Sequence, residues 1–407
     1  MRTRDTIVAG LFVAVTAVSS GRAETKPPYE IVRSLQALHD QMALGNRAAR
    51  AEMPQILRRL GDKLIAANPA AWREPRNARA VVVYILSGGE IRVAQKVLVD
   101  KNCPTSEKRL IEGALAYLEG NKTKAKALLE MVDPRSLEPA VGSHIALALA
   151  ALIAHDEPKK AIKLLDMARV LAPGTLVEDA ALRREVFLAE ETGDFNKFVD
   201  MAGQYLRRFR HSVYAKSFQR GFPAAVEHLA LAGNAQQLAE LGGLLKGLGA
   251  HEELRLFLHV AKSGLVNGKI DVARWASENA VAFAARDSVA AHRATLYDGA
   301  TLILTKDYAR GLAELESVDV RHLPHDDLML REAAIGVATA IRQWPKVSAA
   351  ENKQSSAPGD KPQTIQGDGT SSFPAALAAT MNSGEATVDR AQKMLAETDV
   401  LLERRVQ

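Results

Sequence analysis

The sequence predicts an all-α fold, a degenerate tetratricopeptide-like helical-hairpin solenoid. Alanine is abundant and aromatic residues make up only 5% of the 407 residues, which favours closely packed helices over sheets. Apolar residues recur with a helical period, and no stretch shows sustained period-two alternation. A turn pattern also recurs at nearly regular spacing, which is typical of a repeat array rather than of a single hydrophobic core.

The first 23 residues have the features of a secretory signal peptide. Arg2 and Arg4 form a basic start, residues 7–18 are a run of small and apolar side chains, and residues 21–23 form a small-x-small cleavage site. We expect cleavage after Ala23. The mature chain should not be membrane-anchored, because the apolar run is shorter than the roughly 20 residues that cross a bilayer as a helix.

A recurring turn separates pairs of predicted helices. Each apolar-patterned stretch ends in a turn residue such as Gly, Asn or Asp, and a second stretch begins a few residues later. Successive turns lie 31 to 40 residues apart, close to the roughly 34-residue period of tetratricopeptide hairpins. The seven turns fall near Gly89, Gly120, Asp156, Gly193, Gly233, Gly268 and Lys306.

The fifth residue after each turn is predicted to lie where the second helix approaches the first. Four of the seven are alanine, whose small side chain permits a close approach. Residues 156–173 match the tetratricopeptide pattern best, with Ala161, Leu165 and Ala168 followed by Pro173. The seven positions are Ala94, Ala125, Ala161, Phe198, Leu238, Ala273 and Gly311.

One helical stripe predicts a buried seam particularly clearly, because its apolar residues recur over four turns. Its members are Phe195, Phe198, Val199, Ala202, Tyr205, Leu206 and Phe209.

The chain divides into four predicted segments. After the signal peptide (1–23), the repeat array should fill residues 24–346. Residues 347–372 are rich in Lys, Gln, Ser, Gly, Pro and Thr, a composition that buries too little apolar surface to order itself and predicts a flexible linker. Residues 373–407 regain a helical stripe and predict a C-terminal helical segment, which needs a partner because short isolated helices are marginal in water.

Charge and cysteine content restrict the possible functions. The net charge of +5 falls to +3 once the signal peptide, with three arginines and one aspartate, is removed. So mild and dispersed a charge does not indicate nucleic-acid binding. Cys103 is the only cysteine, which excludes an internal disulfide. It lies in a loop signature without a nearby histidine, so we interpret it as a structural thiol.

No recognised catalytic motif occurs in the sequence. It contains no Gly-x-Ser-x-Gly elbow, no His-Glu-x-x-His helix and no Ser-x-x-Lys nucleophile. The glycine-rich run 242–249 lacks the Gly-Lys-Ser/Thr ending and the preceding strand of a phosphate-binding loop, so it is predicted to be a helix end. We therefore expect no enzymatic activity and no cofactor.

Residues 322–327 have the highest density of potential metal ligands. His322, His325 and one of the two aspartates that follow could supply three ligands, but Pro324 breaks the helix that would hold them in register. We predict a polar loop without a metal, in which Asp326 or Asp327 caps the following helix.

A basic cluster, residues 207–211, ends a predicted helix. Positive charge is favoured there by the helix dipole, which is the simpler interpretation. Arginine also binds carboxylates in bidentate fashion and is enriched at interface anchors. The cluster could therefore contact a partner as well.

Four strings spread over most of the chain are more specific than generic repeat motifs. They are residues 28–36, 75–80, 172–185 and 204–209, the last continuing to Ser212 and to Tyr214 and Ala215. The closing segment, residues 388–402, adds a fifth. Together they resemble the motility protein C (MotC) family of alphaproteobacterial flagellar motors.

This resemblance implies a periplasmic accessory protein that is needed for flagellar rotation and has no enzymatic activity. It implies protein–protein interaction with the periplasmic part of the stator protein MotB. Within the fourth string we select Arg207, Arg208 and Tyr214 as partner-binding residues, because they combine cationic and aromatic character as interface anchors do.

Two alternatives stay open at this point. One is a periplasmic helical-repeat adaptor of another envelope complex, which the repeat pattern fits equally well. The other is an enzyme whose site is assembled from distant repeats, with the loop at residues 322–327 as its best starting point.

Overall fold

The structure, a computed structural model, describes residues 26–285 and 288–343, in which every regular element is a helix. The predicted all-α fold is confirmed. In chain order the α-helices are α1 (Pro28–Ala43), α2 (Arg47–Ile65), α3 (Pro75–Leu86), α4 (Ile91–Val99), α5 (Thr105–Leu118), α6 (Lys122–Leu129), α7 (Pro139–Ile153), α8 (Pro158–Leu171), α9 (Leu176–Glu191), α10 (Phe195–Arg208), α11 (Ala215–Ala232), α12 (Ala235–Leu245), α13 (Ala250–Val266), α14 (Ile270–Phe283), α15 (Val289–Leu302), α16 (Tyr308–Ser317) and α17 (His325–Gln343). Three short 3₁₀ helices join them, namely η1 (Pro69–Arg73), η2 (Pro134–Ser136) and η3 (Val320–His322).

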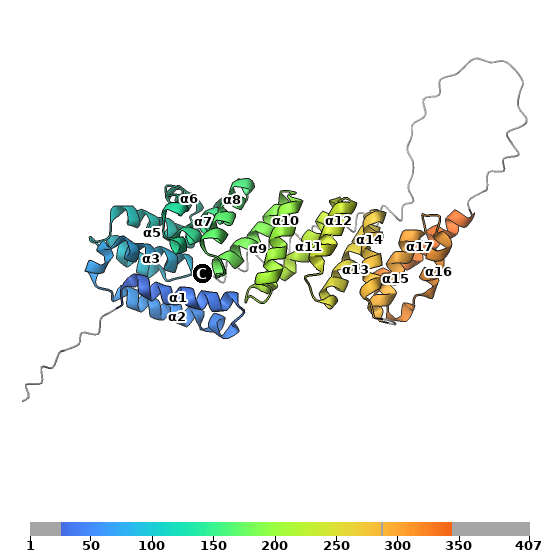
Figure 1. The fold of residues 1–407 in the computed structure, drawn as a ribbon, viewed down its shortest axis with the longest axis horizontal. Coiled ribbons are helices and arrows are strands. Elements are labelled where there is room, and N and C mark those ends of the chain that lie inside the picture. The colour runs from blue at the N-terminus through green and yellow to red at the C-terminus, as the bar shows by residue number, and fades with distance from the viewer. Residues whose placement is uncertain (1–25, 286–287, 344–407) are drawn as a thin grey trace, which may run out of the picture. The chain divides into compact units, whose positions relative to one another are not determined.

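The helices form a solenoid of hairpins. Contacts are most extensive within the pairs α5/α6, α7/α8, α9/α10, α13/α14 and α15/α16. The first helices of successive pairs also pack on one another, as α7 does on α9, α9 on α11, α11 on α13 and α13 on α15. Figure 1 shows these pairs following one another in chain order. Each pair thus buries its apolar face against its neighbours, as repeat arrays do.

All seven predicted turns separate consecutive helices, from α3/α4 to α15/α16. Several of the turns carry a side chain that caps the second helix. Asn121 accepts a hydrogen bond from the Lys124 amide and Asp194 accepts one from the Lys197 amide, while Asn234 forms a capping box with Gln237. These caps satisfy amides that the helix itself leaves free, so the turn residues define the helix starts.

The residue five positions after each turn is buried in all seven hairpins, as predicted. Ala94, Ala125, Ala161 and Ala273 are fully excluded from solvent. In the last hairpin the position is Gly311, where an added Cβ would lie 2.7 Å from the carbonyl oxygen of Gly299 on the facing helix. Small side chains at this position therefore set the distance between the paired helices.

We expect Ala161→Leu to lower the free energy of unfolding by about 1–3 kcal/mol, because Ala161 is completely buried between α7 and α8 and a larger side chain must displace packed neighbours. Urea denaturation followed by circular dichroism measures the loss. Val170→Leu on the same helix is the matched control, since Val170 is 76% exposed. Equal stability of the two variants would show that the repeat register is wrong.

The predicted seam on α10 lies in or against the core, as all seven of its residues do. Tyr205 stacks on Phe218 of α11 with ring centroids 4.1 Å apart, and Phe218 stacks on Phe222 at 4.9 Å. The same stripe therefore joins α10 to the next pair as well as to α9.

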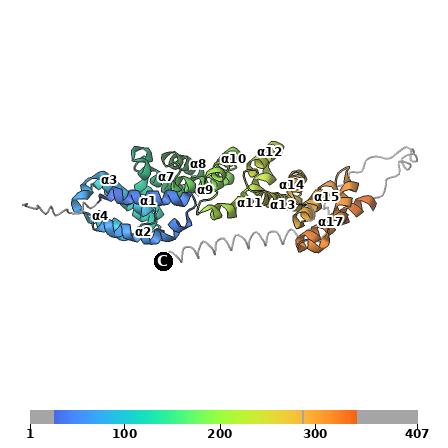
Figure 2. The same ribbon diagram turned by 60° about the horizontal axis from the view of Figure 1, so that its bottom comes forward.

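The α1–α2 hairpin packs on a part of the chain far from it in sequence. Its turn contains Gly45, whose φ of 98° favours glycine and whose added Cβ would collide with the carbonyl oxygen of His211. The Val213 amide donates to the carbonyl oxygen of Met42 at 3.2 Å, and Arg50 donates to the carbonyl oxygen of Val213 at 2.9 Å. The hairpin thus docks on the turn between α10 and α11, alongside α9 (Figures 1 and 2).

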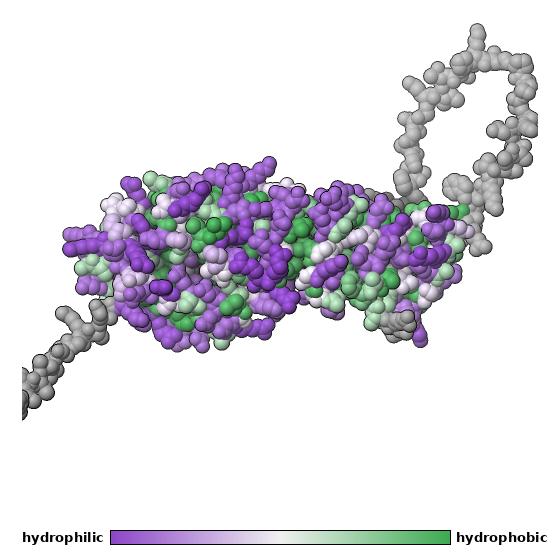
Figure 3. All heavy atoms as spheres, in the orientation of Figure 1, coloured by the Kyte–Doolittle hydropathy of each residue, from purple (hydrophilic) through white to green (hydrophobic). Residues whose placement is uncertain are grey.

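Three of the predicted segments lie outside the described residues, namely the signal peptide (1–23), the linker (347–372) and the C-terminal helical segment (373–407). Among the helices that are described, none is long and apolar enough to span a bilayer. The face shown in Figure 3 is largely hydrophilic, and its apolar residues form small separate areas. Specific cavities and charges are therefore the better guide to a functional site.

Candidate functional site

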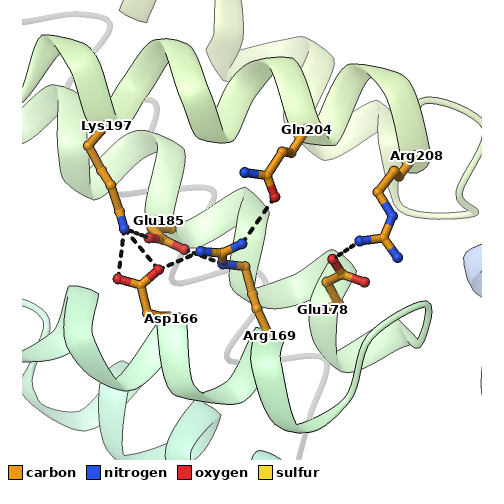
Figure 4. A network of polar contacts seen from close by, with 7 residues as sticks. All are labelled: Asp166, Arg169, Glu178, Glu185, Lys197, Gln204 and Arg208. Carbon is orange, nitrogen blue, oxygen red and sulfur yellow. Dashed lines mark hydrogen bonds and ion pairs between the residues drawn. The ribbon is translucent and has the colours of Figure 1, made fainter.

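A buried polar network joins α8, α9 and α10 (Figure 4). Glu185 of α9 is fully buried, and its carboxylate lies 2.9 Å from Arg169 Nε and 2.7 Å from Lys197 Nζ. Asp166 pairs with the same two cations, and Gln204 accepts a hydrogen bond from Arg169 at 3.1 Å. Burial raises the pKa of Glu185 to about 7, and the two cations oppose this rise. The network has the properties of a structural clamp between helices.

A second buried network lies at the start of α9. Glu178 accepts hydrogen bonds from the Gly174 amide and from Arg208. Asp179, which is also fully buried, pairs with Arg183 at 3.1 Å and accepts a hydrogen bond from Ser212 at 2.9 Å. Acidic side chains are favoured in the first turn of a helix, where they face the positive end of the dipole.

These two networks join the two most informative strings of the sequence. Residues 172–185 supply the buried acids, and residues 204–214 supply their partners Gln204, Arg208 and Ser212. The strings are therefore distant in sequence but interlocked in space. Much of their residue choice is explained by packing of α8, α9 and α10.

The three predicted partner-binding residues lie in different environments. Arg207 is exposed in the last turn of α10, on the side facing Leu244 of α12, and forms no hydrogen bond or ion pair with a described residue. Arg208 is bound to the buried Glu178. Tyr214 is half-buried between two guanidinium groups, those of Arg50 and Arg183, whose Cζ atoms lie 5.0 and 5.3 Å from its ring centre. The structure therefore does not gather them on one surface.

An aromatic cavity opens beside the basic end of α10. Its volume is about 290 Å³, and its walls come from α10, α11 and α13 and from the turns between these helices. The stacked rings of Tyr205, Phe218 and Phe222 line it. The glycine-rich run ends here too, because α12 stops at Leu245 and residues 247–249 form a loop against the cavity, as predicted for a helix end.

The rim of this cavity is mainly basic. Arg210, His211 and Arg255 lie on it with a single acid, Glu252. Arg210 Nε donates to His211 Nε2 at 2.9 Å, but neither Arg210 nor Arg255 pairs with a carboxylate among the described residues. An apolar floor beside unpaired cations is suited to an apolar side chain flanked by acids. The basic cluster pointed to Arg210 and His211, whereas Arg255 lies on a later helix and carried no sequence signal.

The segment at residues 322–327 differs from its prediction. Residue 325 already begins α17, and the amides of Asp327 and Leu328 donate to the carbonyl oxygen of Pro324, so neither aspartate caps the helix. Asp327 is instead fully buried, with Arg293 Nε at 2.7 Å and Lys262 Nζ at 3.0 Å. Although burial opposes ionisation, these partners and Tyr297 hold the pKa of Asp327 below its usual value.

No metal site or reactive thiol is evident among the described side chains, which do not include that of His322. They contain no group of three or more His, Cys, Asp or Glu residues that could hold a metal. Cys103 is unpaired and buried, as expected of a structural thiol. Burial raises the pKa of this thiol to about 11, so it is not a thiolate at neutral pH.

Comparison with known proteins assigns the chain to a family. The family model for chemotaxis protein MotC matches residues 1–407, the whole chain. A chemotaxis protein MotC from Rhizobium meliloti (strain 1021) is 30% identical over 345 residues, which cover 83% of this chain and 78% of that protein. No solved structure matches the chain. The resemblance seen in the sequence is thus confirmed, and the chain is a motility-related protein that belongs to the chemotaxis protein MotC family.

Proposed function

We propose that this chain is a periplasmic accessory protein required for flagellar motor rotation, and that it acts by binding the periplasmic part of the stator protein MotB. The family match over the whole chain carries this proposal. The helical-hairpin solenoid supports it, because such arrays present extended surfaces for protein partners. The chain acts as a binding scaffold and not as an enzyme.

The aromatic cavity and the basic residues around it are the contact site. Arg207, Arg210 and Arg255 are exposed and form no ion pair with a described carboxylate, so they are available to a partner's acids. Arg208 and Tyr214 belong to the same site but act mainly from within. Their contacts with Glu178, Arg50 and Arg183 position the turn that carries Arg210.

The division of roles determines which substitutions test binding cleanly. Arg208→Glu would place a second carboxylate beside the buried Glu178, so its effect would combine misfolding with lost binding. Arg207→Glu, Arg210→Glu and Arg255→Glu change exposed charges alone. The triple variant of these three is therefore the more informative one.

We expect the triple charge reversal to weaken co-purification of tagged mature protein with the periplasmic region of MotB by at least about tenfold, because like charges across an interface are strongly unfavourable. The measurement is pull-down from periplasmic extract, followed by titration with the purified stator fragment. Circular dichroism and export to the periplasm should be unchanged. Arg59→Glu, an exposed reversal on α2, is the matched control and should bind normally.

Three results would contradict the proposal. Normal binding by the triple variant would exclude the aromatic cavity as the contact site. Recovery of another envelope complex without the stator would favour a periplasmic adaptor of that complex. Retention of residues 1–23 in a membrane fraction would contradict the free periplasmic form.

A further inference from the structure

A second cavity lies where the α1–α2 hairpin docks on the array, and we call it the hairpin cavity. Its volume is about 260 Å³. Its walls come from α1, α2, α5, α7 and α9, with Ser87 at the end of α3 and Tyr214 at the start of α11. The cavity exists only because Arg50 and Met42 hold the hairpin to the turn that carries Val213. It is separate from the aromatic cavity and shares no lining residue with it.

Most of the wall is apolar, including Met42, Met53, Leu147 and Val177. Two histidines interrupt it without adding charge. Burial lowers the pKa of His39 to about 4 and also lowers that of His144. His144 Nδ1 lies 2.7 Å from the carbonyl oxygen of Ala140, so this nitrogen carries the proton and donates it. His144 Nε2 is then an acceptor, 3.4 Å from the Ser87 hydroxyl.

The two arginines that line the cavity differ in how their charge is compensated. Arg183 pairs with the buried Asp179 at 3.1 Å and donates to Ser217 at 3.1 Å. Arg184 forms no hydrogen bond or ion pair with any described residue. Surrounding protein and the like charge of Arg183 lower its pKa, yet its side chain stays accessible through the cavity.

The hairpin cavity is therefore electropositive without an internal counter-ion. No carboxylate lines it, and a guanidinium remains charged even when its pKa is lowered. A partly desolvated cation of this kind is stabilised by an anion at bidentate distance. Phosphate or sulfate would satisfy Arg184 but would press its remaining polar oxygens against the apolar wall.

We propose that the hairpin cavity binds a small monocarboxylate with an apolar body. Arg184 holds the carboxylate, the Ser87 hydroxyl is a further donor on the wall, and the apolar body packs against the methionine and leucine side chains. Such a ligand bridges the α1–α2 hairpin and α9, so it stabilises the docked hairpin. This inference is independent of the proposed stator contact.

The test is calorimetric titration of the mature full-length protein with octanoate as the probe. We expect saturable binding at one site and increased hydrogen-exchange protection of α1 and α2. Octanol has the same apolar body without charge and inorganic phosphate is charged without an apolar body, so both should bind at least about tenfold more weakly.

The matched variants are Arg184→Gln and Arg58→Gln, the second being an exposed arginine on α2 outside the cavity. Arg184→Gln should lose octanoate binding by about tenfold or more while its melting temperature is kept or raised, because an uncompensated charge is removed. Arg58→Gln should bind normally. Unchanged binding by Arg184→Gln, equal binding of octanol or phosphate, or no octanoate binding to the wild type would each overturn the proposal.

Discussion

Replacing Asp327 with alanine is expected to lower the free energy of unfolding by about 3–5 kcal/mol, one of the two largest effects of a single substitution in this chain. Asp327 is fully buried at the start of α17, and it is the shared counter-ion of Lys262 on α13 and Arg293 on α15. It also accepts a hydrogen bond from Tyr297 at 2.8 Å. Its removal leaves two partly buried cations and a buried hydroxyl without their acceptor.

The neighbouring Asp326 provides the control. Its side chain is 79% exposed and its one ion pair, with Lys262, is 3.5 Å long, so Asp326→Ala should cost about 0–1 kcal/mol. Urea denaturation measures both variants. Limited proteolysis should also cut the Asp327→Ala protein earlier, near α17, because the network joins this helix to α13 and α15. Equal stability of the two variants would refute a structural role for the buried carboxylate.

A loss of similar size, about 3–5 kcal/mol, is expected for Glu185→Ala at pH 8, above the pKa of about 7 of this carboxyl. The substitution removes the buried partner of Arg169 and Lys197, which are only 14% and 22% exposed. Asp166 would then be left to balance both cations.

Two further substitutions make this prediction specific. Glu191→Ala, at the exposed end of the same helix, should be nearly neutral. Glu185→Gln keeps the shape of the side chain and can still accept a hydrogen bond, so it should cost less than Glu185→Ala. Denaturant titration of the three variants gives the order. A Glu185→Ala protein as stable as Glu191→Ala would mean that the clamp between α8, α9 and α10 contributes nothing.

The hairpins could be predicted from sequence because their determinants are local. Turn residues such as Asn121 and Asp194 cap the helix that follows within three residues, and Ala161 is buried five residues after its turn. A helical period and a small residue in register are visible in one short window of sequence. The all-α fold follows from them.

Long-range pairings were not predictable from the same windows. Arg208 looked like a helix-end cation or a partner contact, but it binds Glu178, which lies 30 residues earlier. Asp327 looked like a cap and is a buried counter-ion for residues on two other helices. The docking of the α1–α2 hairpin joins residues 163 apart. Periodicity fixes which face of a helix is apolar but not which distant charge it meets.

The candidate site was predicted only in part for the same reason. The basic cluster at residues 207–211 correctly marked one side of the aromatic cavity. The other side, with Arg255 and the loop at residues 247–249, comes from the next hairpins and meets the cluster only in the folded array.

The central claim, that this MotC-family chain is needed for motor rotation, is tested most directly by deleting its gene in the bacterium that carries it. Electron microscopy would count flagella, and tracking of single cells would record swimming. We predict assembled flagella that do not turn, with swimming restored by the intact gene but not by the gene for the triple charge reversal at Arg207, Arg210 and Arg255. Deleted cells that swim normally would contradict the motor assignment.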